Sequence, residues 1–169
     1  GNMTFRDLVL KNRSYRRFNQ SFPIERRTLE ELVDLARCTA SASNRQPLKY
    51  ILSVDSARNA DIFSTLSWAG YLKDWGGPAE GERPTAYIII LLDRDISANA
   101  GCDHGIAAQT ILLGACERGL GGCMLGAIQR DKLRKLLAIP TRFDILLVIA
   151  LGQPVEVVVL EDIPADGDI

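Results

Sequence analysis

Length, composition and charge already exclude several classes of protein. The chain has 169 residues, 47% of them hydrophobic and 24% charged, which is typical of a globular protein, so we expect one domain over residues 1–169. Twenty basic and twenty-one acidic residues give a formal net charge of −1, which argues against nucleic-acid binding because no basic field could neutralise phosphates. The longest apolar run, within residues 144–152, is too short to cross a membrane, so a cytoplasmic protein is expected.

Cysteine and histidine usage predicts neither a metal site nor a nucleophilic triad. The single histidine, His104, occurs without a G-x-S-x-G motif, and the cysteines lack C-x-x-C spacing. We expect the cysteines to be reduced and mostly buried. They are Cys38, Cys102, Cys116 and Cys123.

The first two predicted helices each begin with a capping signature. Thr4 with Asp7 predicts a short helix over residues 5–12, and Thr28 with Glu31 predicts a second helix that ends near residue 39. Between them lies KNRSYRRFNQ, residues 11–20, in which three arginines fall within five positions. These arginines can stabilise the end of the preceding helix or, together with a neighbouring serine, bind one small anion. The pattern leaves both interpretations open.

A polar loop follows the second helix. Residues 41–47, SASNRQP, precede the predicted strand YILSV; they are ordinary turn residues, but their side chains also suit the edge of a heterocycle. Residues 57–66 are predicted to be helical. The segment of residues 68–84, which contains Trp68 and Trp75, is interpreted as either a surface loop or a lid over a cofactor.

The second half of the chain contains the predicted core. TAYIIILLD, residues 85–93, predicts a strand covered on both faces. Residues 103–118 predict a helix that is apolar on nearly every side and is therefore buried all round, which suggests a subunit interface. GLGGCMLG predicts a strand approached closely by a ligand or another backbone, or only a helix end and a bulge. A helix over residues 130–138, the strand DILLVIALG and an extended tail complete an α+β fold around a central sheet.

Four segments together resemble the nitroreductase family of FMN-dependent oxidoreductases: NRSYRRF, PIERRTLEELVDLARCTASASNRQPLKYIL, DHGIAAQTILLGACERGLGGCMLGAI and LLAIPTRFDILLVIALGQP. The resemblance implies an α+β fold with a mostly antiparallel central sheet flanked by helices, and a homodimer with a helical interface. It also implies FMN at that interface, with the polar loop supplied by the same or the partner subunit. The resemblance assigns the FMN phosphate to Arg13, Ser14 and Arg16, and the isoalloxazine ring to Ser41, Asn44 and Gln46. It assigns the reactive edge of the flavin to the main chain of Leu125 and Gly126.

Two departures from the family pattern concern the phosphate. Asn12 stands where family members commonly have another arginine, and no Lys or Arg follows Arg142, where the family commonly has a basic pair. Retention of FMN is therefore expected to depend on the arginine cluster, with Arg17 or Lys49 as the residues that could compensate.

The activity implied by the resemblance is ping-pong hydride transfer from NAD(P)H through FMN to a small-molecule acceptor such as a nitroaromatic or a quinone. No protein acid, base or nucleophile is required, because the cofactor supplies the chemistry. The segment Trp68 to Trp75 is a candidate wall or lid of the substrate pocket. Two alternatives remain open: another FMN reaction such as reductive dehalogenation, and a flavin-binding or flavin-lost dimer without reductase activity.

Overall fold

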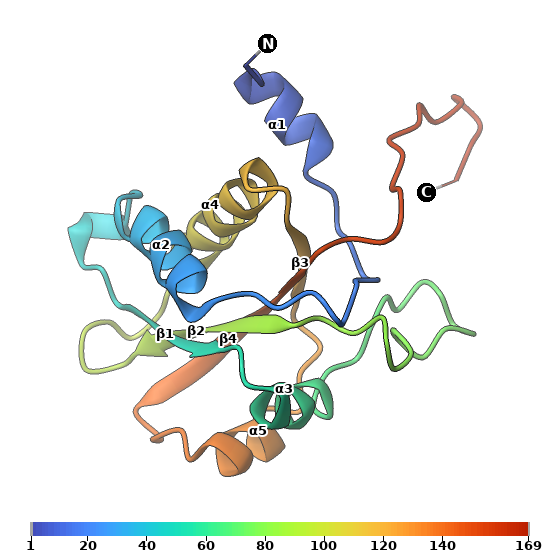
Figure 1. Cartoon of the computed structure of the whole chain (residues 1–169). Helices are drawn as coiled ribbons and strands as arrows, with labels where there is room; N and C mark the ends of the chain where they lie inside the picture. Colours follow the sequence, from blue (N-terminus) through green and yellow to red (C-terminus); the bar gives the residue numbers. More distant parts are fainter. Residues whose placement is uncertain (1, 169) are drawn as a thin grey trace.

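The computed structural model describes residues 2–168, which form an α+β arrangement around one sheet (Figure 1). The first half contains α1 (Phe5–Lys11), α2 (Arg26–Arg37), the short 3-10 helix η1 (Ala42–Asn44), β1 (Leu48–Ser53) and α3 (Ser56–Phe63). The second half contains β2 (Ala86–Asp93), α4 (Asp103–Glu117), β3 (Gly121–Leu125), α5 (Arg130–Leu137) and β4 (Phe143–Gly152). Within this part of the chain, no helix has the length and apolarity needed to cross a membrane.

The sheet confirms the predicted central antiparallel arrangement. Its strand order is β1-β2-β4-β3, and every pair of neighbours is antiparallel. β2 and β4 therefore lie in the centre, while β1 and β3 form the two edges. Helices α2 and α4 cover one face of the sheet, and α3 and α5 cover the other (Figure 1).

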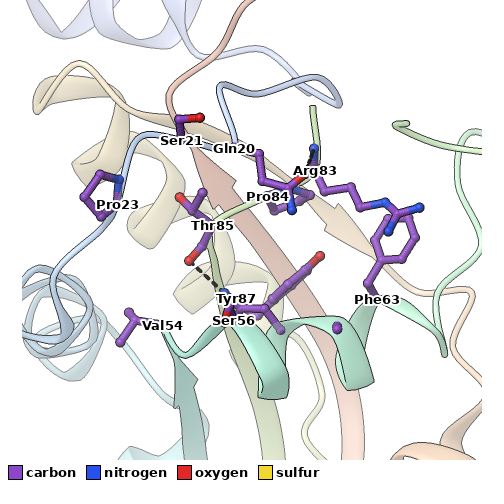
Figure 2. A pocket seen from close by; sticks show the side chains of 12 residues that line it. Gln20, Ser21, Pro23, Val54, Ser56, Phe63, Arg83, Pro84, Thr85 and Tyr87 are labelled. Carbon is purple, nitrogen blue, oxygen red and sulfur yellow. Dashed lines mark hydrogen bonds between the residues drawn. The ribbon is translucent and has the colours of Figure 1, made fainter. Parts of the chain in front are cut away.

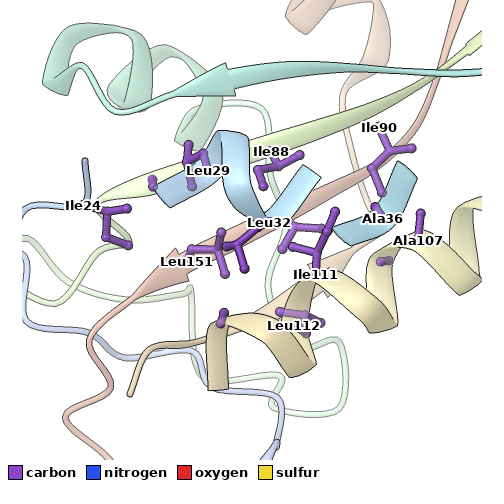
Figure 3. Close-up of a cluster of buried hydrophobic side chains, with 14 residues drawn as sticks. Ile24, Leu29, Leu32, Ala36, Ile88, Ile90, Ala107, Ile111, Leu112 and Leu151 are labelled. Carbon is purple, nitrogen blue, oxygen red and sulfur yellow. The ribbon is translucent and has the colours of Figure 1, made fainter. Parts of the chain in front are cut away.

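Alternation along β2 supplies a hydrophobic core on each face. Ile88 and Ile90 pack with α2 and α4 (Figure 3), whereas Tyr87 and Ile89 pack with the α3 and α5 side. Successive strand residues point to opposite faces, so a strand buried on both faces is expected to be a continuous apolar run. All eight residues of β2 are buried; the first seven form that run, and the eighth, Asp93, is charged and pairs with Arg142 at 3.2 Å.

Helix starts were predicted with mixed success. The capping box of α1 is present, with the Thr4 hydroxyl accepting from the Asp7 N–H and the Asp7 carboxylate accepting from the Thr4 N–H. The predicted start of the second helix at Thr28 is wrong, because α2 begins at Arg26. Glu31, expected to complete a capping box, instead accepts from Arg27 at 3.1 Å and pairs with Arg118 at 2.6 Å.

One burial prediction needs correction, and a second is not tested by a single chain. The helix now seen as α4 leaves Ile106 39% exposed within one chain, so its burial at a subunit interface stays a prediction. Cys116 and Cys123 are buried as expected, but Cys38 and Cys102 are exposed. The exposed pair lies at the C-terminal cap of α2 and the N-terminal cap of α4, where no sheet covers them.

Candidate functional site

The arginine cluster lies along the free edge of β3. Ser14 forms a parallel bridge with Gly122, whose carbonyl accepts from the Tyr15 N–H at 2.9 Å. A Cβ placed on Gly121 would come within 2.6 Å of the Tyr15 ring, so this approach requires a residue without a side chain. The predicted close approach at the glycine-rich strand is thus confirmed, with a neighbouring chain segment as the approaching group.

One cavity of about 570 Å³, here termed the clasp cavity, is lined by all three residues assigned to the phosphate: Arg13, Ser14 and Arg16. Two polar atoms at this cavity, Asn12 Oδ1 and Arg16 Nε, are buried without a hydrogen-bond partner. Buried polar atoms are normally paired, so both atoms are suited to a ligand that enters the cavity. The lining consists of Val9, Asn12, Arg13, Ser14, Arg16, Gln109, Leu112, Met124 and Val158.

The arginines differ in their existing contacts. Arg13 donates to the main-chain oxygens of Asn12 at 2.8 Å and Val9 at 3.1 Å, so its guanidinium stabilises the C-terminal end of α1 as the helix-end interpretation predicts. The main-chain N–H of Arg16 donates to the Glu156 carboxylate at 2.7 Å. In the Arg16 side chain, Nη1 reaches the main-chain oxygen of Ser14 only at 3.4 Å. Arg16 is therefore the arginine with the most unused donor capacity at the cavity.

Neither residue named as a possible substitute lies at this cavity. Arg17 pairs with Glu82 at 3.9 Å and lies 5.4 Å from the centre of the Trp75 ring. Lys49 lines a different pocket, near the polar loop. Within one chain, neither residue therefore replaces the missing basic contacts at the clasp cavity.

The polar loop is held by a residue that is distant in sequence, Asp103. The Asp103 carboxylate accepts from the Ser41 hydroxyl at 2.7 Å and from the Ala42 N–H at 3.1 Å. The Ser41 oxygen in turn accepts from the Gln46 N–H at 3.0 Å. Asp103 is only 6% exposed and is the first residue of α4, where the partial positive charge of the helix end stabilises a carboxylate.

The anchored loop is strained. Ser43, Asn44 and Gln46 have φ angles of 52°, 51° and 52°, a left-handed conformation that asparagine tolerates and most other side chains avoid. The Gln46 side-chain amide donates to Asn44 Oδ1 at 2.9 Å. Strain of this kind is found at binding and catalytic sites, which favours a functional interpretation of the loop over that of an ordinary turn.

Ser41 and Gln46 line a second pocket of about 310 Å³, here termed the loop pocket, whereas Asn44 lies outside its lining. Tyr50 also lines this pocket, and burial together with the nearby Asp103 charge raises the pKa of its hydroxyl. The phenol therefore remains protonated and available as a donor at neutral pH.

One chain does not bring the clasp cavity and the polar loop together. The two cavities share no lining residue. On α4, Asp103 and Ala107 face the loop pocket and Leu112 faces the clasp cavity; at about 100° per residue, Asp103 and Leu112 lie on opposite sides of the helix. Within one chain, the two groups of residues therefore face different spaces.

The end of β3 differs from expectation in detail. The Leu125 side chain is buried in the α3/α5 core, and Gly126 is exposed, with Leu147 at 3.9 Å as the nearest atom to a Cβ placed on it. The residue of this strand that reaches the clasp cavity is Met124. Because the Gly122 carbonyl points outward to Tyr15, the two-residue period of a strand places the main chain of Met124, not Leu125, on the free edge.

The tryptophan segment divides into a buried and an exposed part. Trp68 is 7% exposed and its ring centre lies 6.0 Å from that of Phe63 in the α3/α5 core; its role in the wall of a substrate pocket stays a prediction. Trp75 packs against the same core and Arg17, and its role stays a prediction. Tyr71 and Leu72 are the large exposed side chains of the segment.

Several residues at these cavities could not be recognised from sequence. Asp103 carries the only signal, an acidic residue at the first position of a helix. Gln109, Met124 and Val158 join the clasp cavity through tertiary packing alone. Over residues 2–168, no group of three or more His, Cys, Asp or Glu side chains could hold a metal ion.

Comparison with known proteins agrees with the geometry. The family model described as "Nitroreductase family" matches residues 9–153. A protein of Methanothermobacter thermautotrophicus, provisionally named NADH dehydrogenase/NAD(P)H nitroreductase, is 27% identical over 89% of this chain and 77% of its own length. The NADPH-flavin oxidoreductase of Vibrio harveyi is 23% identical over 88% of this chain, which spans 65% of that enzyme's length. The solved structure of an FMN-dependent nitroreductase from Clostridium difficile R20291, 20% identical, shares the fold with a TM-score of 0.75 over 92% of this chain and 90% of that one.

Proposed function

The chain belongs to the nitroreductase family, and on this premise we propose that it is an FMN-dependent oxidoreductase that oxidises NADH or NADPH and reduces a flat acceptor such as a nitroaromatic or a quinone. The names of its relatives support the cofactor and the reductant. The observation that carries the proposal is the clasp cavity, where the donor Arg16 Nε is buried without a partner beside Arg13 and Ser14. The chemistry would be that of bound FMN, which can take up a hydride from a nicotinamide and pass the electrons on.

The residues of this chain would bind and orient the cofactor. Arg16 and the Ser14 hydroxyl bind the phosphate at the free edge of β3, with Arg13 joining them once its guanidinium leaves the end of α1. A guanidinium and a hydroxyl both donate hydrogen bonds, which matches a phosphate that can only accept them at neutral pH. Met124 and the exposed Gly126 lie where a flat ring could pass close to the strand.

The polar loop would complete the site from a second copy of the chain. Ser41, Asn44 and Gln46 present donors and acceptors for a ring edge, but within one chain they lie on the opposite side of α4 from the clasp cavity. Apolar side chains left exposed fit a homodimer joined partly by helices. They include Phe5 of α1, 72% exposed, Ile106 of α4 and Val157 of the tail, 89% exposed.

One observation favours the second candidate, a dimer that does not retain flavin. The Glu156 carboxylate lies 2.7 Å from the Arg16 N–H, beside the proposed phosphate position, and a negative charge there opposes a dianion. The two candidates differ in whether the protein binds FMN and whether NADH or NADPH reduces it. An FMN enzyme binds added FMN and its flavin absorbance bleaches anaerobically on addition of NADH or NADPH, whereas the flavin-free dimer does neither.

The experiment that tests the site assignment is an FMN titration of wild type and Arg16→Ala, followed by flavin fluorescence. Loss of a charge-assisted contact to the phosphate should weaken FMN binding by roughly 10- to 100-fold. Arg17→Ala is the matched control, because Arg17 is adjacent in sequence but pairs with Glu82 and Trp75 outside the cavity. Equal FMN affinity in Arg16→Ala and wild type would contradict the assignment.

A further inference from the structure

A third pocket, of about 290 Å³, lies on the α3 side of the sheet (Figure 2) and shares no lining residue with the clasp cavity or the loop pocket. It is formed by residues 20–23, the residue that follows β1, helix α3 and the segment of residues 83–87 that leads into β2. Below we call it the α3 pocket. Nothing in the proposed oxidoreductase chemistry makes use of it.

Two hydroxyls at the α3 pocket have no partner. The Tyr87 side chain is 1% exposed, and its hydroxyl oxygen is buried without a hydrogen bond, as is Thr85 Oγ1. By contrast, Asn59 in the same lining is satisfied, since it accepts from Ser53 at 2.7 Å and donates to the Thr85 main-chain oxygen at 2.9 Å. A phenylalanine would fill the core at Tyr87 equally well, so the hydroxyl needs another explanation.

The single charge of the pocket lining is positive. The Arg83 guanidinium lies 4.3 Å from the centre of the Phe63 ring, and its Nε donates to the Pro78 oxygen at 3.4 Å. No Asp or Glu lines the pocket. Figure 2 shows the Tyr87 hydroxyl on the side of the pocket where Phe63 and Arg83 lie.

The Tyr87 hydroxyl is a donor at neutral pH. Burial is the largest cause of the raised pKa of this hydroxyl, and the nearby Cys123 thiol raises the pKa further. The positive charge of Arg83 lowers it. Arg83 and Tyr87 both line the α3 pocket, so the cation and the hydroxyl face the same space. The pocket thus offers two hydroxyl donors and one guanidinium, a set that calls for a ligand rich in acceptors and carrying one negative charge.

We propose that the α3 pocket is a second ligand site that binds a small organic monocarboxylate. The carboxylate accepts hydrogen bonds from the Tyr87 and Thr85 hydroxyls and pairs with Arg83, and the body of the ligand lies along the apolar lining contributed by Phe63 and Val54. A carboxylate fits better than a phosphate, because one guanidinium balances one charge. A volume of about 290 Å³ restricts the ligand to the size of a single ring.

Benzoate is a suitable probe, measured by calorimetry and by ligand-observed NMR with the purified full chain. Tyr87→Phe removes only the hydroxyl and should weaken benzoate binding by roughly 10- to 100-fold. It should leave the melting temperature without ligand unchanged or higher, because an unpaired buried hydroxyl is lost. Arg83→Gln, which removes the charge, should weaken binding at least as much.

Tyr50→Phe is the matched control, since it removes a tyrosine hydroxyl at the loop pocket instead. Unchanged benzoate affinity in Tyr50→Phe, together with weakened binding in Tyr87→Phe, would support the proposal. Absence of saturable benzoate binding by wild type, which would mean that water alone fills the pocket, would overturn it. Equal affinity in Tyr87→Phe and wild type would overturn it as well, because benzoate would then bind elsewhere.

Discussion

Asp103 is the residue whose replacement should most affect the polar loop. Its buried carboxylate accepts hydrogen bonds from the Ser41 hydroxyl and the Ala42 N–H. Each hydrogen bond to a charged group contributes about 1.5 to 3 kcal/mol, and the position at the start of α4 adds about 0.3 to 1 kcal/mol. Relief of the buried charge offsets part of this sum. We therefore expect Asp103→Ala to lower the free energy of unfolding by about 3 kcal/mol.

Asp103→Asn separates the charge from the shape of the side chain. The asparagine oxygen can still accept from the Ala42 N–H, but its amide then faces Ser41, whose oxygen already accepts from the Gln46 N–H. The Ser41 hydroxyl must turn and lose its acceptor, so we expect an intermediate loss of about 1 to 2 kcal/mol. Urea unfolding followed by circular dichroism measures both variants, at one fixed protein concentration because association would shift the apparent stability.

Asp131→Asn is the control for the helix-end charge alone. Asp131 lies exposed in the first turn of α5, where no side-chain cap bond is formed, so its replacement should cost only about 0.3 to 1 kcal/mol. Hydrogen exchange at Gln46 should accelerate in Asp103→Ala and remain slow in Asp131→Asn, because only the first loses the Ser41 anchor. If Asp103→Ala costs no more than Asp131→Asn, the loop is not held by Asp103 and the reasoning is refuted.

Two further predictions concern the core around β3. Gly122→Ala would place a Cβ into the main-chain oxygen of Ala150 in β4 and should cost more than about 3 kcal/mol of stability or prevent folding. In Gly126→Ala the new Cβ meets no atom closer than 3.9 Å, so its melting temperature should stay near that of wild type. Equal melting temperatures of the two variants would contradict the β3–β4 packing. Burial raises the pKa of the Cys123 thiol from 9.0 to about 12, so the unfolded chain loses this proton first and stability should fall as pH rises from about 9 to about 12. Cys123→Ala should flatten that fall in urea unfolding series, and an unchanged slope would show that the thiol does not contribute.

Most of the fold was predictable because its signals are local. The capping box of α1, the apolar run of β2 and the helix over α4 each depend on neighbours in sequence, and each was found. The start of α2 was missed because Glu31, read as part of a local cap, has a tertiary partner in Arg118. Strand order also required the structure: the lysine in β1 is consistent with an edge strand, but no local signal gives the order β1-β2-β4-β3.

The site was predictable in its segments but not in its geometry. The motif residues of the arginine cluster do gather at one cavity, and the sequence predicted both helix-end and anion contacts for these arginines, but it could not tell that Arg13 bonds to the end of α1 while Arg16 retains unused donors. The left-handed conformation of Gln46 could not be foreseen either, because glutamine rarely adopts it. It is maintained by an anchor, Asp103, that lies 62 residues away from Ser41 in the chain.

The division of the site between the two sides of α4 has a thermodynamic consequence. If a second chain supplies the Ser41–Gln46 loop to the clasp cavity, FMN contacts both chains and binds the dimer more tightly than the single chain. Linkage is reciprocal, so the factor by which dimerisation raises FMN affinity is also the factor by which FMN tightens the dimer. The clasp cavity offers few basic contacts, and Arg16 has the largest unused donor capacity among them. Its affinity for FMN then depends in part on the loop of the partner. Weak phosphate binding and a strained, firmly anchored loop are, on this account, two parts of one shared site.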